Sequence, residues 1–139
     1  MLKQVILIRE DLKLPRGLLA AQVAHIHMES FRQVMLAGLH KKNGKSVSLQ
    51  DELGDGTIHE WLKTPYIFIH GVPNLEALHF FMDEAGEKDL DVAAWSDTIY
   101  LEFSPNFKRA FPNILVGAAI GPAESDVIKS VIGDLPLLA

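Results

Sequence analysis

The sequence predicts an α/β fold, in which one domain holds a mixed sheet of about four strands with helices on both faces. The main observation is the order along the chain, where runs of strand length alternate with segments of helical periodicity. The length agrees, because 139 residues with 48% hydrophobic content suffice for a single domain over 1–139 with its own core.

The first strand and the first helix are the clearest elements. Residues 5–8 read Val-Ile-Leu-Ile, and an apolar run without alternation is typical of a central strand covered on both faces. A charged turn with proline and glycine follows over residues 9–17. From Gly17 to about Leu39, small and apolar residues recur at helical spacing, which predicts an amphipathic helix that ends near Gly38.

The next stretch predicts a loop and then a short helix. Residues 40–56 are polar and contain three glycines, so we expect a mobile loop, and loops of this length are usually functional or disordered. Thr57 and Glu60 have the spacing of a capping box, which predicts the start of the short helix.

A second strand and helix follow. Residues 66–70 are apolar and aromatic and are bounded by Pro65 and Gly71, which predicts a strand. Asn74 is then the expected N-cap of a helix that ends at Gly86.

The last part of the chain predicts two or three strands and a helix. Residues 90–95 form a weaker third strand, which residues 98–103 either extend or follow as another strand. Residues 104–113 contain two prolines and are expected to form a loop, and the apolar residues 114–120 form the next strand. Gly121 and Pro122 are expected to begin the final helix, because proline is favoured at a first helical position. Sites in such sheets form beyond the carboxyl ends of strands, here at the turns 9–17, 70–74, 96–98 and 121–123.

Composition excludes some classes of protein. Without cysteine there is no disulfide framework and no thiolate site, and the first residues lack the apolar length of a secretory segment. We therefore expect a cytoplasmic protein. No apolar run reaches the roughly 20 residues that a membrane span needs, so a membrane partner is not expected.

Charge is distributed unevenly along the chain. The net charge of −5 alone argues against a polyanionic partner, yet residues 1–45 hold eight lysines or arginines against three acids. Such asymmetry can mark an interaction surface, and the alternative is a set of ordinary solvated side chains.

A polar stripe on the first helix is the main candidate site. Its members recur at steps of four, three, four and three, which places them on one face: Leu18, Gln22, His25, Glu29 and Arg32. Histidine can act as a general base, glutamine can orient a water molecule, and Glu29 could orient His25. The alternative is an ordinary set of partly buried, hydrogen-bonded side chains.

Metal and nucleotide sites are not expected. His25, His27 and Glu29 alternate along a helix and therefore point apart, which leaves too few ligands for a metal site. The glycines of residues 117–121, GAAIG, match neither a P-loop nor a dinucleotide fingerprint. We therefore expect no cofactor.

Two segments resemble the type 2 peptidyl-tRNA hydrolases. Residues 11–25, DLKLPRGLLAAQVAH, resemble the family's opening motif without a gap, and residues 120–138, IGPAESDVIKSVIGDLPLL, resemble its closing motif. The matched positions in the opening motif are Asp11, Leu12, Lys13, Gly17, Ala20, Ala21, Gln22, Ala24 and His25. Residues 38–63 and 97–113 match poorly. The resemblance implies the same α/β architecture and a hydrolase that cleaves the ester between peptide and tRNA, with water as the nucleophile.

The resemblance also implies a set of site residues. Its aspartate and threonine motif falls on residues 96–101, so Gln22, His25, Asp97 and Thr98 are the implied catalytic residues. The implied substrate-binding residues are Lys13, Arg16, Gly17 and Leu18. Leu18 stands where the family has a lysine, and the glycine and final threonine of the aspartate motif are absent.

These departures leave two functions open. One is a hydrolase that binds tRNA through its basic N-terminal turn, and the other is a non-catalytic relative that binds tRNA, a ligand or a protein. The oligomeric state is open as well, with a homodimer as one option.

Overall fold

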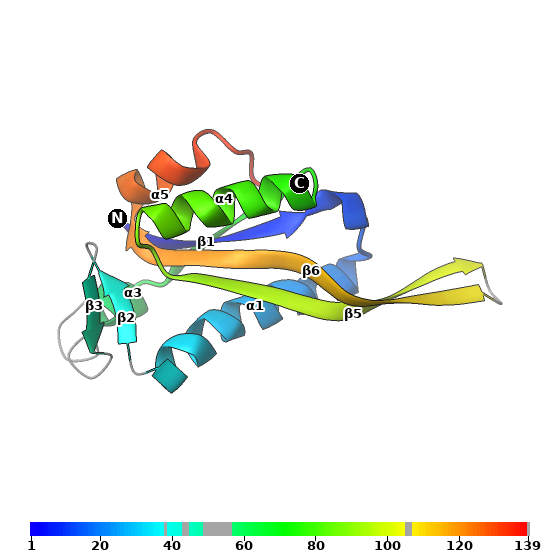
Figure 1. The fold of residues 1–139 in the computed structure, drawn as a ribbon, viewed down its shortest axis with the longest axis horizontal. Helices are drawn as coiled ribbons and strands as arrows, with labels where there is room; N and C mark the ends of the chain where they lie inside the picture. The colour runs from blue at the N-terminus through cyan, green and yellow to red at the C-terminus, as the bar shows by residue number, and fades with distance from the viewer. Residues whose placement is uncertain (38, 43–44, 49–56, 105–106, 139) are drawn as a thin grey trace.

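A four-stranded mixed sheet forms the centre of the molecule. The structure is a computed structural model that describes residues 1–37, 39–42, 45–48, 57–104 and 107–138. The strands lie in the order β4 (Tyr66–Val72), β1 (Leu2–Arg9), β6 (Phe107–Glu124), β5 (Val92–Ser104). β4 pairs parallel with β1, and β6 runs antiparallel to both of its neighbours, which confirms the predicted mixed sheet (Figure 1).

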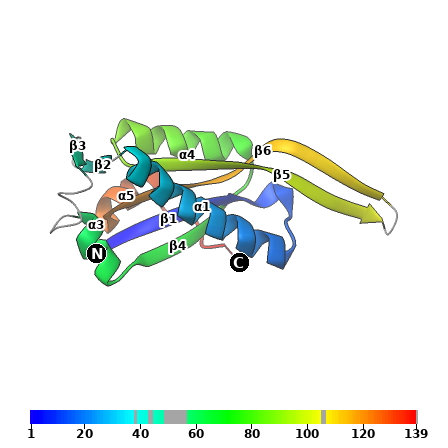
Figure 2. The ribbon, with the colours of Figure 1, turned by 90° about the horizontal axis from the view of Figure 1, so that it is seen from below.

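Helices cover both faces of this sheet, as predicted. α1 (Arg16–Ala37) lies on one face, and α4 (Leu75–Glu87) and α5 (Ser125–Ile132) lie on the other (Figures 1 and 2). A single 3-10 turn, η1 (Glu10–Leu12), connects β1 to α1, and the short α3 (Thr57–Lys63) precedes β4. None of the described helices has the length and apolar character that a membrane span requires.

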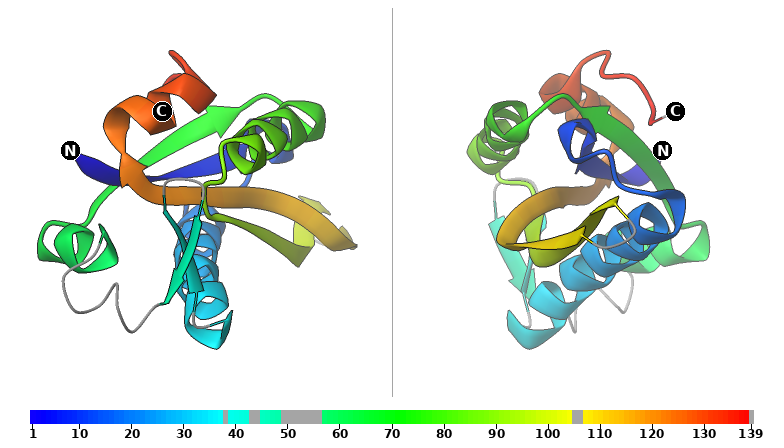
Figure 3. Two further views of the ribbon diagram at one scale, coloured as in Figure 1. Left: turned by 60° about the vertical axis from the view of Figure 1, so that its left-hand side comes forward. Right: turned by 90° about the vertical axis from the view of Figure 1, so that its right-hand side faces the viewer.

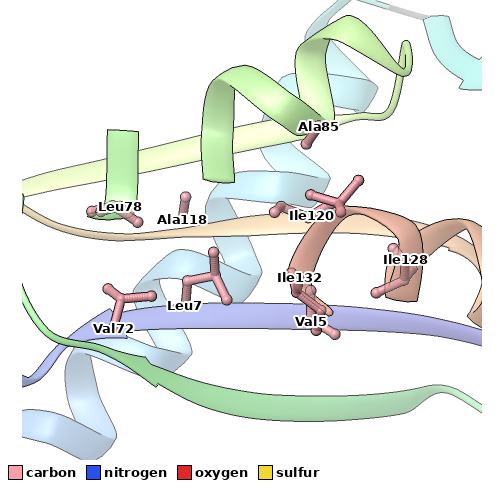
Figure 4. Close-up of a cluster of buried hydrophobic side chains, with 10 residues drawn as sticks. Val5, Leu7, Val72, Leu78, Ala85, Ala118, Ile120, Ile128 and Ile132 are labelled. Carbon is pink, nitrogen blue, oxygen red and sulfur yellow. The ribbon is translucent and has the colours of Figure 1, made fainter. Parts of the chain in front are cut away.

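β1 is the central strand because both of its faces are buried. Val5 and Leu7 belong to the cluster under α4 and α5, which Figure 4 shows. Ile6 and Ile8 belong to the second cluster, on the side of α1. The apolar run does not alternate with polar residues because side chains on both faces of the strand pack against helices.

α1 lies close to the sheet because β6 has a glycine where the two cross. A Cβ atom at Gly117 would collide with the backbone carbonyl oxygen of Leu7 and would lie 2.9 Å from the Cδ1 of Ile26 on α1. The position therefore accepts only glycine without a shift of α1 or β1.

The predicted helix caps have mixed outcomes. Asn74 caps α4 as predicted, because its side-chain oxygen accepts a hydrogen bond from the backbone N–H of Ala77 at 2.9 Å. The expected helix start at Gly121 and Pro122 is wrong. β6 continues to Glu124 because the first residues of β1 still pair with it, Leu2 with Glu124, and α5 begins only at Ser125.

The predicted loop over 40–56 is wrong for the part that the structure describes. β2 (Leu39–Lys42) and β3 (Lys45–Ser48) form a separate two-stranded antiparallel sheet, beyond the end of α1 (Figure 3). In the sequence these strands are separated by Asn43 and Gly44, a dipeptide typical of hairpins. Residues 49–56 of the predicted loop lie outside the described residues.

The predicted loop over 104–113 is also wrong for the part that the structure describes, because β5 reaches Ser104, β6 begins at Phe107, and the two form a long ribbon that extends beyond the helices (Figure 1). Residues 105–106 lie outside the described residues. Asp97 pairs with Ile114 and Ile99 pairs with Phe111, so the register shifts between them. Pro112 lies within this irregularity, where no ladder hydrogen bond is required of it. The strand predicted over 66–70 is correct but continues to Val72.

Candidate active site

Gln22 links α1 to β5 through two hydrogen bonds. Its Nε2 donates to the Oδ2 of Asp97 at 3.1 Å, and its Oε1 accepts from the Nε1 of Trp95 at 2.9 Å. The side chain is only 2% exposed. Two of the implied catalytic residues, Gln22 and Asp97, are therefore in direct contact although they are far apart in the sequence.

The alternation of β5 aims Asp97 at α1. Alternate residues of a strand share one face, and Ala93 and Ile99 both pack in the cluster beneath α1. Trp95 and Asp97 lie between them on the same face. Thr98 has the opposite parity and contributes its backbone N–H, which donates to the Oδ1 of Asp97 at 2.7 Å.

His25 lies beside this pair. Its exposed ring stacks on the indole of Trp95, with centroids 4.9 Å apart and planes 8° from parallel. Figure 2 shows α1, which carries His25 and Gln22, in front of the sheet. Trp95 therefore contacts both Gln22 and His25.

The expected pairing of Glu29 with His25 is wrong. The Glu29 carboxylate accepts from Nε and Nη2 of Arg32, each at 2.7 Å, and from Nε2 of Gln33 at 3.1 Å. The hydrogen bonds from Arg32 lower the pKa of Glu29, with further help from Gln33 and the charge of Arg32. Arg32 and Gln33, one turn further along the helix, therefore bind the Glu29 carboxylate that was expected to pair with His25.

Of the three cationic residues in the basic turn, Arg9 is paired and the other two are exposed. Arg9 donates from Nε and Nη2 to both oxygens of Asp11, which lowers the pKa of that carboxyl, and from Nη1 to the carbonyl of Leu115. Lys13 and Arg16 are exposed and form no ion pair with any residue that the structure describes. Among the three cations of this turn, Lys13 and Arg16 are therefore the two available to an anion.

Gly17 and Leu18 have different surroundings. Gly17 is exposed, and a Cβ atom there would meet nothing within 4 Å. Leu18 is half-buried and packs against the cluster beneath α1. Its side chain therefore serves the core at the position where a lysine was expected from the resemblance.

Two of the four predicted site turns, residues 9–17 and 70–74, follow the parallel strands β1 and β4 at the same end of the sheet. The turn predicted over 96–98 is wrong, because these residues lie within β5, although toward that same end of the sheet. Residues 121–123 lie at the opposite end, because β6 is antiparallel, so that part of the prediction is wrong.

A separate polar group lies further along α1. His27 Nδ1 is 2.7 Å from Oε1 of Gln4, whose Nε2 donates to Ser30, and burial lowers the pKa of His27. Among the described residues, no three histidines or acids lie close enough together to hold a metal ion.

Comparison with known proteins identifies the family. The model of the family "Peptidyl-tRNA hydrolase PTH2" matches residues 2–138. The chain belongs to the PTH2 family. It is 32% identical to a peptidyl-tRNA hydrolase of Methanopyrus kandleri, with 99% of each chain covered. It is 31% identical to a protein of the same name from Staphylothermus marinus, covering 98% of this chain and 94% of that one. The resemblance found in the two motifs is thereby confirmed.

Trp95 is the functional candidate that the sequence did not suggest. It lies one residue before the segment that was compared with the family's aspartate motif, and an aromatic residue in a strand reads as core. A signal was available, because period-two alternation places Trp95 on the same face as Asp97.

Proposed function

We propose that the protein hydrolyses the ester between a peptide and the 3′-terminal ribose of tRNA. The observation that carries the proposal is the Gln22–Asp97 hydrogen bond, which brings a carboxylate to the helix that bears the PTH2 opening motif. His25 lies on the same helix, one turn away. The relatives named peptidyl-tRNA hydrolase support this reaction class and do not favour the non-catalytic alternative.

Asp97 is the proposed general base. Its two oxygens accept one hydrogen bond each from the protein, which leaves lone pairs for a water molecule. The water oxygen would attack the ester carbonyl carbon while its proton passes to Asp97. The bond from this carbon to the ribose 3′-oxygen then breaks.

His25 is the proposed acid for the leaving group. Its ring is exposed yet fixed in plane by the stack on Trp95, so an edge can face a substrate. It would give a proton to the ribose 3′-oxygen, and the products are a free 3′-hydroxyl and a peptide carboxylate. Gln22 is too deeply buried to meet substrate, and we assign it the positioning of Asp97.

Lys13 and Arg16 are the proposed contacts for tRNA phosphate. Arg16 lies six residues before Gln22 on α1, which corresponds to about 9 Å along a helix. The phosphate closest to the scissile ester is only one ribose away from it, so a cation at this distance suits the substrate. Charge-assisted contacts to phosphate position a nucleic acid without reading its sequence.

Homodimer formation remains a prediction, which analytical ultracentrifugation tests.

The test is cleavage of an N-acetylated aminoacyl-tRNA by the purified protein, compared with spontaneous hydrolysis. Asp97→Asn should lower the rate by at least about 100-fold, because a general base typically contributes that much. Asp126→Asn is a matched control, since Asp126 also accepts from the next backbone N–H, at 3.0 Å, but is an exposed residue of α5 on the other face of the sheet. It should leave the rate unchanged. Cleavage no faster than the spontaneous rate by the unaltered protein would contradict the proposal.

A further inference from the structure

Trp95 makes the two contacts that fix the polar side chains of the site. Its indole N–H donates to Oε1 of Gln22 at 2.9 Å, and its ring stacks on His25 at 4.9 Å. It is half-buried and packs against the cluster beneath α1, so its own position is determined by the core. The neighbours on its strand face are Ala93 and Asp97.

The hydrogen-bond chemistry allows only one orientation of the Gln22 amide. The indole nitrogen can only donate, and an ionised carboxylate can only accept. The amide oxygen must therefore face Trp95, which turns the NH2 group toward Asp97. The reverse orientation would place donor against donor and acceptor against acceptor. The indole N–H and the carboxylate thus hold the amide in the same orientation from its two sides.

The stack performs a similar task for His25. Parallel rings in contact restrict rotation of the imidazole, and the ring has no hydrogen bond with another residue that the structure describes. Trp95 is the contact that holds its plane. Loss of the indole would release the imidazole and leave the Gln22 amide held by Asp97 alone.

We infer that Trp95 is a positioning residue of the active site, which orients Gln22 toward Asp97 and fixes the ring plane of His25. The inference rests on the proposed function, because it assigns Trp95 a role in that reaction. Trp95 acts through these two side chains and does not need to touch the reacting atoms.

Two substitutions separate the two contacts. Trp95→Phe keeps a ring that can stack on His25 and removes the N–H, so kcat should fall about tenfold, as expected for one hydrogen bond, while KM stays within about twofold. Trp95→Leu removes both contacts and should lower kcat further, by about 100-fold. In a Gln22→Leu background, Trp95→Phe should have no additional effect, because the partner of the N–H is already gone.

Trp61 supplies the matched control. It is the chain's other tryptophan, it is 1% exposed, and its N–H also donates a hydrogen bond, to the carbonyl of Tyr66 at 3.1 Å. Trp61→Phe should lower thermal stability but leave kcat unchanged. An equal loss of kcat in both variants would overturn the inference, because any lost tryptophan hydrogen bond would then have the same effect.

A measurement without substrate distinguishes this inference from the proposed function. In nuclear magnetic resonance spectra, Trp95→Phe should move the side-chain amide signals of Gln22, and Trp95→Leu should move the ring signals of His25 as well, whereas Trp61→Phe should move neither. Unmoved signals overturn the inference whether or not the protein is active. Moved signals with an unchanged kcat also overturn it, and moved signals in a protein that cleaves no ester refute the proposed function instead.

Discussion

Leu18→Lys should raise the activity of the protein. Leu18 is the third residue of α1 and lies one turn before Gln22, at the end of the helix where backbone N–H groups and the helix dipole favour an anion. A lysine there would add an ammonium group that can hold a phosphate or the developing oxyanion. We therefore expect the unaltered protein to be slow and the variant to be faster.

The size of the expected gain in kcat/KM follows from what a lysine at position 18 could do, which is to hold a phosphate or the developing oxyanion. A well-placed donor for an oxyanion is worth about 100-fold to 1,000-fold in rate, and a flexible lysine should recover part of it. We expect at least a tenfold increase in kcat/KM, which corresponds to a barrier lower by roughly 1.4 kcal/mol.

The gain should come with a modest loss of stability. Leu18 is half-buried against the core, but the aliphatic part of a lysine can cover the same surface. A cation in the first turn also opposes the helix dipole, by about 0.3–1 kcal/mol. A total cost of about 1–2 kcal/mol is tolerable for a domain of this size.

The assay measures kcat/KM on N-acetylated aminoacyl-tRNA beside a thermal melt of each variant. Leu18→Gln is the control, because it has a similar length and polarity without the charge, and it should give no comparable gain. Rapid hydrolysis by the unaltered protein would refute the reasoning, since another cation such as Arg16 would then replace the lysine. A folded lysine variant without any gain would refute it as well.

Four further outcomes are expected. Replacing Lys13 and Arg16 with alanine should weaken tRNA binding and flatten the slope of log affinity against log salt by about 1.4–1.8; an unchanged slope removes the turn from the binding surface. His25→Ala should abolish hydrolysis but change the free energy of unfolding by only about 0.5 kcal/mol in a melt, because the residue is exposed. Gly117→Ala should destabilise the fold by about 1–3 kcal/mol in urea titration, since the added methyl group meets backbone. Burial lowers the pKa of His27 below the ordinary 6.5, so the unfolded chain binds the proton first and stability should fall as the pH drops through about 6.5; His27→Gln should reduce this dependence.

The elements that were predicted correctly carry dense local signals. The first strand is an uninterrupted apolar run, α1 has sustained helical periodicity, and α4 begins at a side chain that visibly caps it. Each of these signals depends on residues within one or two turns. Local chemistry was therefore sufficient to place them.

The errors fall where the structure depends on a distant partner. From the local sequence alone, Pro112 predicts a loop. An irregularity in the pairing of β5 and β6 accommodates this proline within a strand. The pairing of Leu2 with Glu124 similarly extends β6 past the glycine and proline that were expected to start a helix. Neither register can be read from the segment itself.

The candidate site likewise contains residues that the sequence predicted and residues that it did not. Gln22, His25 and Asp97 were available from the motif, because residue type and order in the chain mark them. Trp95 and the true partner of Glu29 were not, since both depend on which side chains meet in space. Arg32 and His25 are both within one turn of Glu29 on the helix, three and four residues away, and the charge of Arg32 makes it the stronger partner.

The contact between Gln22 and Asp97 depends on the crossing of α1 over β6 at Gly117. β6 lies between β1 and β5, so the helix that follows β1 must pass over β6 before it can reach Asp97. Gly117 pairs with Ile8 on one side and with Trp95 on the other, and Ile26 of α1 lies directly over it. Four residues earlier on the same helix, Gln22 therefore meets the partner strand of this glycine. A methyl group at Gly117 would lift α1 from this crossing, so Gly117→Ala should lower kcat as well as stability.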